Sequence, residues 1–248
     1  MTTKIGLIWP GGGSEQEYYK FEESLNFNIR FYLACSKVGG NSESDHDLSA
    51  LLQTAKIEWI AEAAERILCM DPHCIYWACT SGSFIKGKNF AEEQILKLNE
   101  ITKKPVGSTS IAFIKALDYL KIRDISVIAS YPENILKKFT SFLEEFNLNI
   151  VSQWYLNAKS GWDASNLDKK LIENQIINMN YDKSKAILIP DTAMPTLEHI
   201  KIFENLTNKF ILTANQVSIW DSINISNNRY IQKKKNINLN KYGKLFLS

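Results

Sequence analysis

Two polar residues directly follow short apolar segments and could carry out nucleophilic or acid–base chemistry. Cys79 follows HCIYWA and Asp191 follows KAILIP, and each is followed by a threonine, Thr80 or Thr192. A thiol at the start of a helix meets free backbone N–H groups and the positive end of the helix dipole, which favour the thiolate below the usual pKa of about 8.5. Cys79 is therefore the candidate nucleophile or base, and Asp191 is its candidate acid–base partner.

Both residues also have a purely structural interpretation. A cysteine at the end of a strand is often a packing residue. The Thr-Ser-Gly-Ser that follows Cys79 favours a functional role, because the hydroxyls of Thr80 and Ser81 suit a substrate carboxylate. Asp191 is equally well placed to cap a helix that starts near Pro195. The two roles of Asp191 are compatible, and the sequence leaves both open.

The loop PGGGS after the first apolar segment permits close approach of backbone to an anion, which makes Pro10, Gly11 and Gly13 candidates for substrate binding. It lacks the full GxGxxG pattern of dinucleotide-binding loops, and we expect no cofactor. Tyr131 holds the corresponding place in the second half, where its hydroxyl can donate to a carboxylate or pack between lobes. Thr192 completes the candidate binding residues.

Further polar residues follow later apolar segments, and we expect one or two of them to touch substrate: Ser108, Thr109, Ser110, Thr213, Asn215 and Gln216. Aromatic side chains that could narrow the pocket are Trp9, Trp77, Tyr131, Trp162 and Trp220.

The elements that position these residues follow from alternating apolar and helical periodicity, which predicts an α/β fold with parallel strands. We predict strands at residues 4–9, 73–78, 105–107, 125–129, 150–155, 186–190 and 210–212. We predict helices at residues 49–70, 90–102, 111–120, 132–146, 168–179, 195–206 and 217–223, with a further helix starting after Cys79.

The two halves of the chain repeat the same order of parts. Strands KIGLIW, HCIYWA and KPVG in the first half correspond to DISVIA, KAILIP and KFIL in the second. Such a duplication predicts two similar lobes with parallel sheets, related by a pseudo-twofold axis, whose strand-end loops face each other across one cleft. We expect the first lobe to comprise residues 1–115 and about 216–226, and the second lobe residues 116–215. In this arrangement Cys79 opposes Asp191.

Charge and cysteine content exclude several classes of function. Lys and Arg total 29 against 27 Asp and Glu, a formal charge of +2, so neither nucleic acid nor a membrane is an expected partner. Residues 227–248 are basic without any acid, and we expect a solvated tail or a contact in a homo-oligomer. The four cysteines form neither a disulfide framework nor a zinc pattern, and His46, His73 and His199 form no ligand set, so we expect no metal. Without a signal-like start or a run of about 20 apolar residues, we expect a cytoplasmic protein.

Five segments together resemble a known family: CTSGSFIKG from Cys79, KPVGSTSIAFIKAL, SYPENILKKFTSFL from Ser130, LIPDTAMPTLEHI and TANQVSIWDSI. Through them, from about residue 5 to about residue 223, the chain resembles arylmalonate decarboxylases. It also resembles their relatives in the Asp/Glu racemase superfamily, the maleate cis–trans isomerases and the aspartate, glutamate and hydantoin racemases. The resemblance implies proton transfer next to a carboxylate, without cofactor, between two cysteines on opposite faces of the substrate.

Carried over by position, Cys79 matches the first cysteine, Thr80 and Ser81 the carboxylate-binding hydroxyls, and Tyr131 the substrate-binding tyrosine. The sequence departs from the family where Asp191 replaces the second cysteine, and where Gly13 stands near an asparagine of the isomerases. The PGGG loop resembles the decarboxylases, whereas Cys79 resembles the isomerases and racemases. We therefore expect an isomerase or racemase that acts by proton transfer or thiol addition next to the carboxylate of a small (di)carboxylic acid. The alternatives are a decarboxylase of a malonate-like diacid and a ligand-binding protein that has lost catalysis.

Overall fold

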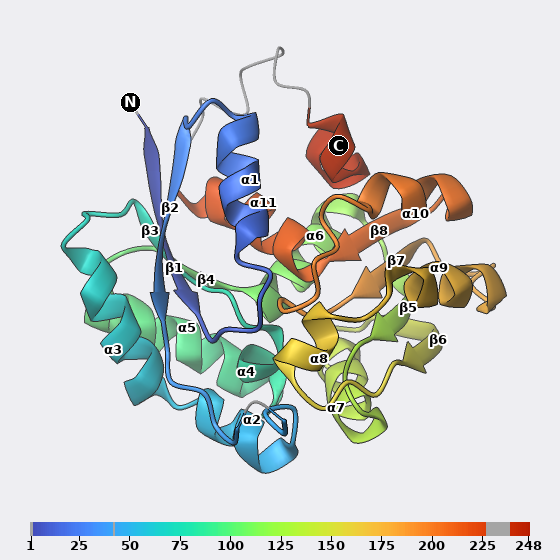
Figure 1. The fold of residues 1–248 in the computed structure, drawn as a ribbon, viewed down its shortest axis with the longest axis horizontal. Coiled ribbons are helices and arrows are strands. Elements are labelled where there is room, and N and C mark those ends of the chain that lie inside the picture. Colours follow the sequence, from blue (N-terminus) through green and yellow to red (C-terminus); the bar gives the residue numbers. More distant parts are fainter. Residues whose placement is uncertain (1, 42, 227–238) are drawn as a thin grey trace.

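The strands form two parallel four-stranded sheets that lie side by side (Figure 1). The structure, a computed structural model, describes residues 2–41, 43–226 and 239–248. The first sheet has the order β2-β1-β3-β4 and consists of β1 (Thr3–Trp9), β2 (Ile29–Cys35), β3 (Cys74–Trp77) and β4 (Val106–Ser108). The second has the order β6-β5-β7-β8 and consists of β5 (Asp124–Ala129), β6 (Asn149–Tyr155), β7 (Ala186–Ile189) and β8 (Phe210–Thr213). The equivalent strand order confirms the predicted fold class of two similar α/β lobes.

Helices cover the outer faces of both sheets and fill the space between them (Figure 1). They are α1 (Gln16–Ser24), α2 (Leu48–Thr54), α3 (Ile57–Leu68), α4 (Thr80–Phe84), α5 (Lys88–Thr102), α6 (Thr109–Leu120), α7 (Glu133–Glu144), α8 (Gly161–Ser165), α9 (Lys169–Asn178), α10 (Ile200–Thr207) and α11 (Ala214–Ile225). Helix α3 packs on β1 and β2, whereas α11 packs on β3, β4 and α6. In the second lobe α7 packs on β6 and α10 on β8.

The alternation of side chains along β1 explains how the lobes are joined. Ile5, Leu7 and Trp9 point into a core that continues through both lobes and includes Val127 and Leu188 of the second sheet. Ile8 points to the opposite face, into a smaller core shared with Trp77 and Cys79. Because one apolar interior runs across both lobes, the strand ends that meet between them are held in fixed positions.

The long predicted helix at residues 49–70 is two helices. Helix α2 ends at Thr54 and α3 begins at Ile57, because Lys56 takes an extended conformation with ψ 126°. The carbonyl of Ala55 accepts a hydrogen bond from the Gln94 side chain at 3.1 Å instead of continuing the helical ladder.

Helix α10 also differs from the prediction, because it begins at Ile200 and not at Pro195. The backbone N–H of Leu197 is bound to the Glu17 carboxylate at 2.6 Å, so this turn is tied to helix α1. Helices α1 and α8 and strand β2 were not predicted. Helix α1 is rich in polar residues, two of which, Glu17 and Glu22, are buried.

The end of the chain packs against the protein. Two short 3₁₀ helices, Asn240–Tyr242 and Lys244–Leu247, lie beside α1 and α10, and Tyr242 and Leu245 are buried. The ring of Tyr242 lies 4.8 Å from that of Phe21, between ring centroids. Residues 239–248 are therefore not the solvated tail expected from their charge, since Leu239, Tyr242 and Leu245 are buried beside the lysines. Residues 227–238 of that basic segment lie outside the described residues.

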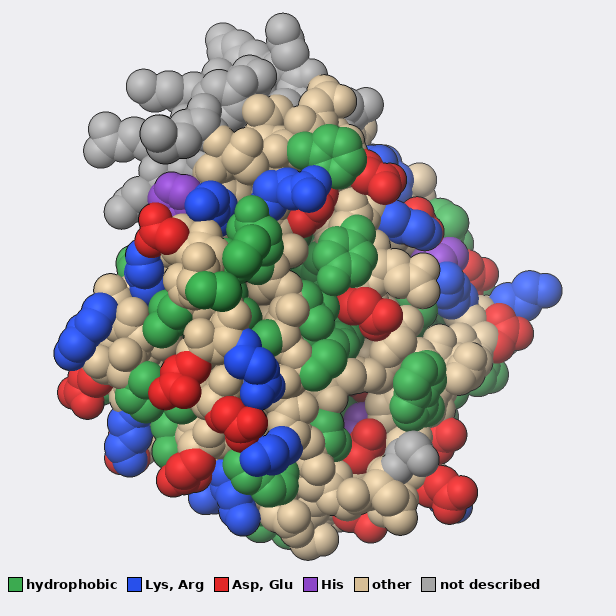
Figure 2. Space-filling model, turned by 60° about the vertical axis from the view of Figure 1, so that its left-hand side comes forward, with side chains coloured by type: hydrophobic (Ala, Val, Ile, Leu, Met, Phe, Trp, Pro, Cys, Tyr) green, Lys and Arg blue, Asp and Glu red, His purple; other side chains and the backbone are tan. Residues whose placement is uncertain are grey.

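Charged side chains of both signs are interspersed with apolar ones on the face shown in Figure 2. Within the part of the chain that the structure describes, no helix combines the length and apolar character needed to cross a membrane.

Candidate active site

A cavity of about 280 Å³ lies where the strand ends of the two lobes meet. The first lobe contributes Pro10, Gly11, Gly12, Val38, Gly40, Asn41, Asp45, His46, Leu51, Thr54, Cys79 and Ser81, and the second contributes Gly161, Trp162, Asp191, Thr192 and Ala193. Its volume is close to the lower end of the range of about 300–1,000 Å³ seen for pockets of drug-sized ligands. The cavity therefore suits a small molecule.

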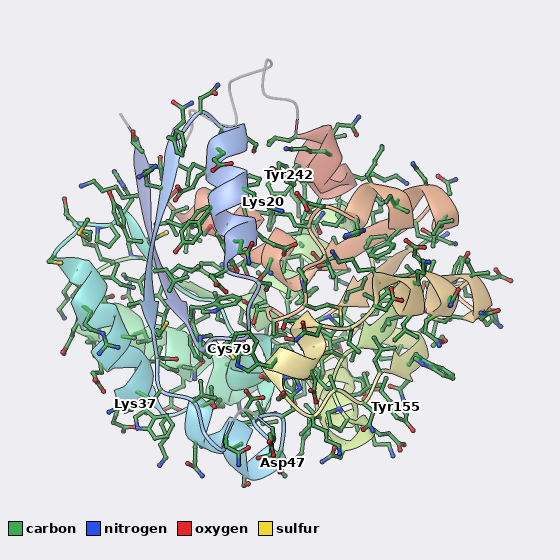
Figure 3. All side chains as sticks on the ribbon, viewed as in Figure 1. Lys20, Lys37, Asp47, Cys79, Tyr155 and Tyr242 are labelled. Atoms are coloured by element: carbon green, nitrogen blue, oxygen red, sulfur yellow. The ribbon has the colours of Figure 1, made fainter. Side chains whose placement is uncertain are left out.

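Cys79 caps helix α4 and faces the place where the two lobes meet (Figure 3). It lies two residues beyond Trp77, the last residue of β3, and its Sγ accepts a hydrogen bond from the Gly82 backbone N–H at 3.2 Å. The Ser81 hydroxyl lies 3.7 Å from Sγ. A Cβ at Gly82 would lie 2.8 Å from the Trp77 ring and 3.0 Å from Sγ, so glycine is needed for this close approach.

The protonation of Cys79 differs from the sequence expectation. Burial raises the pKa of the Cys79 thiol to about 12, and the carboxylates of Asp191 and Asp45 add to the shift. The Gly82 N–H and the Ser81 side chain lower it, but by less. The cap was predicted to favour the thiolate. That prediction is wrong because the sequence did not reveal how completely the residue is buried or that a second carboxylate, Asp45, acts on it together with Asp191.

Asp191 occupies the matching place in the second lobe. It lies two residues beyond Ile189, the last residue of β7, and lines the same cavity as Cys79. Its Oδ2 accepts a short hydrogen bond from the Ser130 hydroxyl, and its Oδ1 accepts one from the Ala193 N–H at 2.9 Å. No helix starts directly after Asp191, since α10 begins at Ile200. The carboxylate therefore holds a turn, not the first turn of a helix.

His46 and Asp45 belong to the site and were missed in the sequence. His46 Nε2 lies 3.9 Å from Asp191 Oδ2, and its ring meets that of Tyr131 edge-on at 5.2 Å between centroids. Asp45 Oδ1 accepts a hydrogen bond from the Gly161 N–H at 2.8 Å. Both residues lie in the loop between β2 and α2. The only signal was the polar run SESDHD before a predicted helix, which is also typical of a solvent-exposed loop.

The glycine loop after β1 reaches across to the second lobe. Gly12 has a φ of +111°, and a Cβ there would lie 2.7 Å from the Cβ of Ala193. The hydroxyl of Ser14 donates a short hydrogen bond to the carbonyl of Thr192. This loop therefore packs directly on the turn that carries Asp191.

The predicted binding residues fall into two groups. Pro10, Gly11, Ser81 and Thr192 line the cavity. Gly13, Thr80 and Tyr131 do not line it: Gly13 packs near Trp162 and Ser165, whereas Thr80 and Tyr131 are buried behind the wall. Burial raises the pKa of Tyr131 well above its usual value, with Asp191 and Cys79 adding to the shift. Its phenol is therefore a protonated hydrogen-bond donor close to both candidate catalytic residues.

The six polar residues expected to face the cleft from later strands do not line the cavity. Thr109 is bound to Ser218 at 2.7 Å, and Gln216 donates to the Tyr242 carbonyl at 2.8 Å. Asn215 donates to the Thr192 carbonyl at 3.1 Å and to Glu17 at 2.7 Å, so it supports the Asp191 turn from behind. Of the five aromatic residues considered for the pocket, Trp162 lines it.

Lysine and arginine are missing from the cavity wall formed by the described residues. A substrate carboxylate would therefore be bound by hydroxyls and backbone N–H groups, of which Ser81, Thr192 and the glycine loop are the nearest sources. The acidic groups Asp45 and Asp191 and the imidazole of His46 line the same wall.

The geometry can be compared with known proteins. A model of the arylmalonate decarboxylase family matches residues 49–236, which include both Cys79 and Asp191. Comparison with curated protein sequences gives no significant match.

Solved structures of similar fold include maleate isomerase from Pseudomonas putida S16, in a cysteine-to-alanine variant with maleate (TM-score 0.85, 15% identity, 99% of this chain and 98% of that one). A liganded double mutant of arylmalonate decarboxylase has a TM-score of 0.81 at 20% identity, covering 99% of each chain. A cysteine-to-serine variant of maleate cis–trans isomerase from Nocardia farcinica, with a covalently bound succinylcysteine intermediate, has a TM-score of 0.81 at 16% identity, covering 99% of this chain and 98% of that one. The fold agrees along the whole chain, and the family match spans most of it. The chain therefore belongs to the arylmalonate decarboxylase family.

Proposed function

We propose that the protein is a cofactor-independent isomerase or racemase that moves a proton at the carbon next to a carboxylate of a small carboxylic or dicarboxylic acid. The observation that carries the proposal is the placement of Cys79 and Asp191. The two residues follow equivalent strands, β3 and β7, and line one small cavity from opposite lobes. Stereochemical inversion requires an acid on one face of the carbon and a base on the other.

The surroundings of Cys79 define its role. With a pKa of about 12, its resting form is the thiol, which donates a proton to a carbanion on its own face. The base on the Asp191 side removes the proton from the opposite face. The developing enediolate is stabilised by donors such as the Ser81 hydroxyl and the backbone of the glycine loop.

A decarboxylase of a malonate-like diacid is the second candidate. The raised pKa of Cys79 favours it, because a single thiol proton is what the carbanion needs after carbon dioxide leaves. Such a reaction also benefits from an apolar pocket around the departing carboxylate. Asp45 and His46 make one wall of the cavity polar, which favours the isomerase or racemase.

The test is incubation of the protein in D₂O with four acids: maleate, D-aspartate, L-aspartate and 2-methyl-2-phenylmalonate. We expect deuterium to enter next to a carboxylate without release of carbon dioxide. Conversion of maleate to fumarate would in addition require the Cys79 sulfur to add to the double bond and to leave again after rotation about the central C–C bond. Cys79→Ala should abolish turnover, whereas Cys69→Ala, at an exposed cysteine, should leave it unchanged.

Two other outcomes would replace the proposal. Carbon dioxide release from 2-methyl-2-phenylmalonate alone would establish the decarboxylase. Binding of these acids without turnover, at an affinity that Cys79→Ala leaves unchanged, would establish a ligand-binding protein of the same fold.

A further inference from the structure

The imidazole of His46 is fixed inside the cavity by the lobe opposite its own. His46 belongs to the loop between β2 and α2 of the first lobe, yet its backbone N–H donates to the Lys159 carbonyl of the second lobe at 3.1 Å. Its neighbour Asp45 accepts a hydrogen bond from Gly161 at 2.8 Å. Only 7% of the His46 side chain is exposed. The loop therefore spans the cleft and holds the ring in one place.

Hydrogen bonding determines which ring nitrogen is free. His46 Nδ1 lies 2.9 Å from the carbonyl oxygen of Ala158. A carbonyl can only accept, so Nδ1 carries the hydrogen and Nε2 of the neutral ring carries the lone pair. Nε2 lies on the side of Asp191, 3.9 Å from Oδ2, and His46 lines the cavity.

Asp191 is bound differently. Each of its oxygens already accepts a hydrogen bond from its own lobe, one from Ser130 and one from Ala193. Because Asp191 Oδ2 lies 3.9 Å from Nε2, its negative charge can balance the imidazolium that forms when Nε2 takes up a proton. The ring of Tyr131 packs against His46 edge-on, at 5.2 Å between centroids.

We propose that His46 Nε2 is the atom that removes and returns the proton on the face opposite Cys79, with Asp191 as its charged partner. The inference deepens the proposed function and rests on it. In one direction the C–H bond breaks, its electron pair stays on the substrate as an enediolate, and the proton goes to Nε2. The S–H bond of Cys79 then breaks as a new C–H bond forms on the other face, and sulfur keeps the electron pair. Proton exchange with water restores the imidazole and the thiol.

Substitutions at His46 can distinguish a role of Nε2 in proton transfer from a structural role of the hydrogen bond to the Ala158 carbonyl. His46→Asn retains a side-chain N–H that can bind the Ala158 carbonyl but has no atom at the Nε2 position. His46→Gln places an amide near Nε2 that cannot carry a proton back and forth. His199→Asn is the matched control, because His199 stacks on Phe203 away from the cavity.

In the D₂O assay with the same four acids, both His46 variants should lose at least about 100-fold in kcat, the size of a general acid–base contribution, with little change in KM. His199→Asn should match the wild type. Wild-type turnover by His46→Asn would overturn the proposal.

A second measurement does not depend on turnover. The chain has 3 histidines, so ¹⁵N-histidine NMR can be assigned with the variants His46→Asn and His199→Asn. The neutral His46 ring should be in the Nδ1–H form, and malonate, used as a probe, should shift its Nε2 signal. Asp191→Asn should shift the same signal. An Nε2–H form, or an Nε2 signal insensitive to malonate, would overturn the role of His46 even if none of the four acids is turned over.

Discussion

The environment of Cys79 determines the form in which the thiol can act. One backbone N–H and one hydroxyl approach the sulfur, yet complete burial and two facing carboxylates outweigh them and raise its pKa to about 12. A thiol of this kind is a proton donor in its resting state. It becomes a nucleophile or base only after a proton has been transferred away from it.

Alkylation measures this state directly. Between about pH 6 and 9 we expect iodoacetamide to label Cys79 far more slowly than the exposed Cys35 and Cys69, because only thiolate reacts. The rate at Cys79 should keep rising with pH over this range without a plateau. Mass spectrometry of the peptides gives all three rates in one sample. Fast labelling of Cys79 that levels off below pH 8.5 would instead show the stabilised thiolate that its position after a strand suggests.

Individual site residues could be predicted where the neighbouring sequence marks them. Cys79 and Asp191 were found because each directly follows an apolar strand and because the halves repeat. His46 was not, since its partner Ala158 is 112 residues away in the chain and only the folded cleft brings the two together. The protonation of Cys79 depends in the same way on residues from distant segments.

The glycine loop after β1 requires backbone conformations that residues with a side chain rarely adopt. Gly11 and Gly12 have φ values of +113° and +111°, but only Gly12 is packed against another residue, Ala193. A side chain at either position strains the backbone by about 1–3 kcal/mol. At Gly12 it would in addition push against the turn that carries Asp191.

Alanine substitutions at Gly11 and Gly12 distinguish the effect of backbone strain from the effect of displacing the turn that carries Asp191. Gly11→Ala should lower the free energy of unfolding by about 1–2 kcal/mol, since the space around its Cβ is open. Gly12→Ala should cost more and should lower kcat, because Ala193 and the neighbouring Asp191 must move. Urea unfolding and kinetics of both variants check this. Equal losses in stability and unchanged kcat for both would show that the Ala193 contact does not position Asp191.

Helices and strands were predicted correctly where the hydrophobic periodicity is strong. The prediction failed where contacts with distant residues determine where an element begins or ends. The duplication predicted the matching strands, although β2, the counterpart of the predicted strand at 150–155, was overlooked because IRFYLAC mixes polar and apolar residues. The break between α2 and α3 has no Gly or Pro to mark it. It depends on Gln94, from another helix, binding the Ala55 carbonyl.

At the scale of the whole molecule, a buried carboxylate joins the two lobes. Glu17 of α1 accepts hydrogen bonds from Asn215 at 2.7 Å and from the Leu197 N–H at 2.6 Å. Burial raises the pKa of Glu17 from 4.5 to about 7, despite these bonds. Between pH 4.5 and 7 the folded protein holds a proton that the unfolded chain releases, so stability falls as pH rises through this range.

Glu17→Gln should remove this pH dependence. The difference in unfolding free energy between wild type and variant should fall by about 2–3 kcal/mol from pH 5 to pH 8, as measured by urea denaturation. Glu93→Gln is the control, because Lys97 lowers the pKa of that exposed carboxylate and its titration lies below this range. Parallel stability curves for wild type and Glu17→Gln would show that the carboxylate keeps an ordinary pKa.

The C-terminal segment also contributes to the stability of the whole molecule. Tyr242 is buried against Phe21 of α1, and its carbonyl accepts a hydrogen bond from Gln216 at 2.8 Å. Tyr242→Ala should lower the free energy of unfolding by about 3 kcal/mol, the usual cost of removing a buried ring. Tyr242→Phe keeps the ring and should stay near wild type. A loss below about 0.5 kcal/mol in the alanine variant would show that the segment is dispensable for stability.

The contact between Tyr242 and Phe21 has a consequence for biosynthesis. Phe21 leaves the ribosome 221 residues before Tyr242, and helix α11, which covers β3 and β4, is made after the strands of both sheets. A nascent chain exposes apolar surface on its first sheet until helix α11 has been made. The second lobe, whose strands are contiguous in sequence, is complete sooner. The first lobe therefore acquires its full apolar cover after the second lobe.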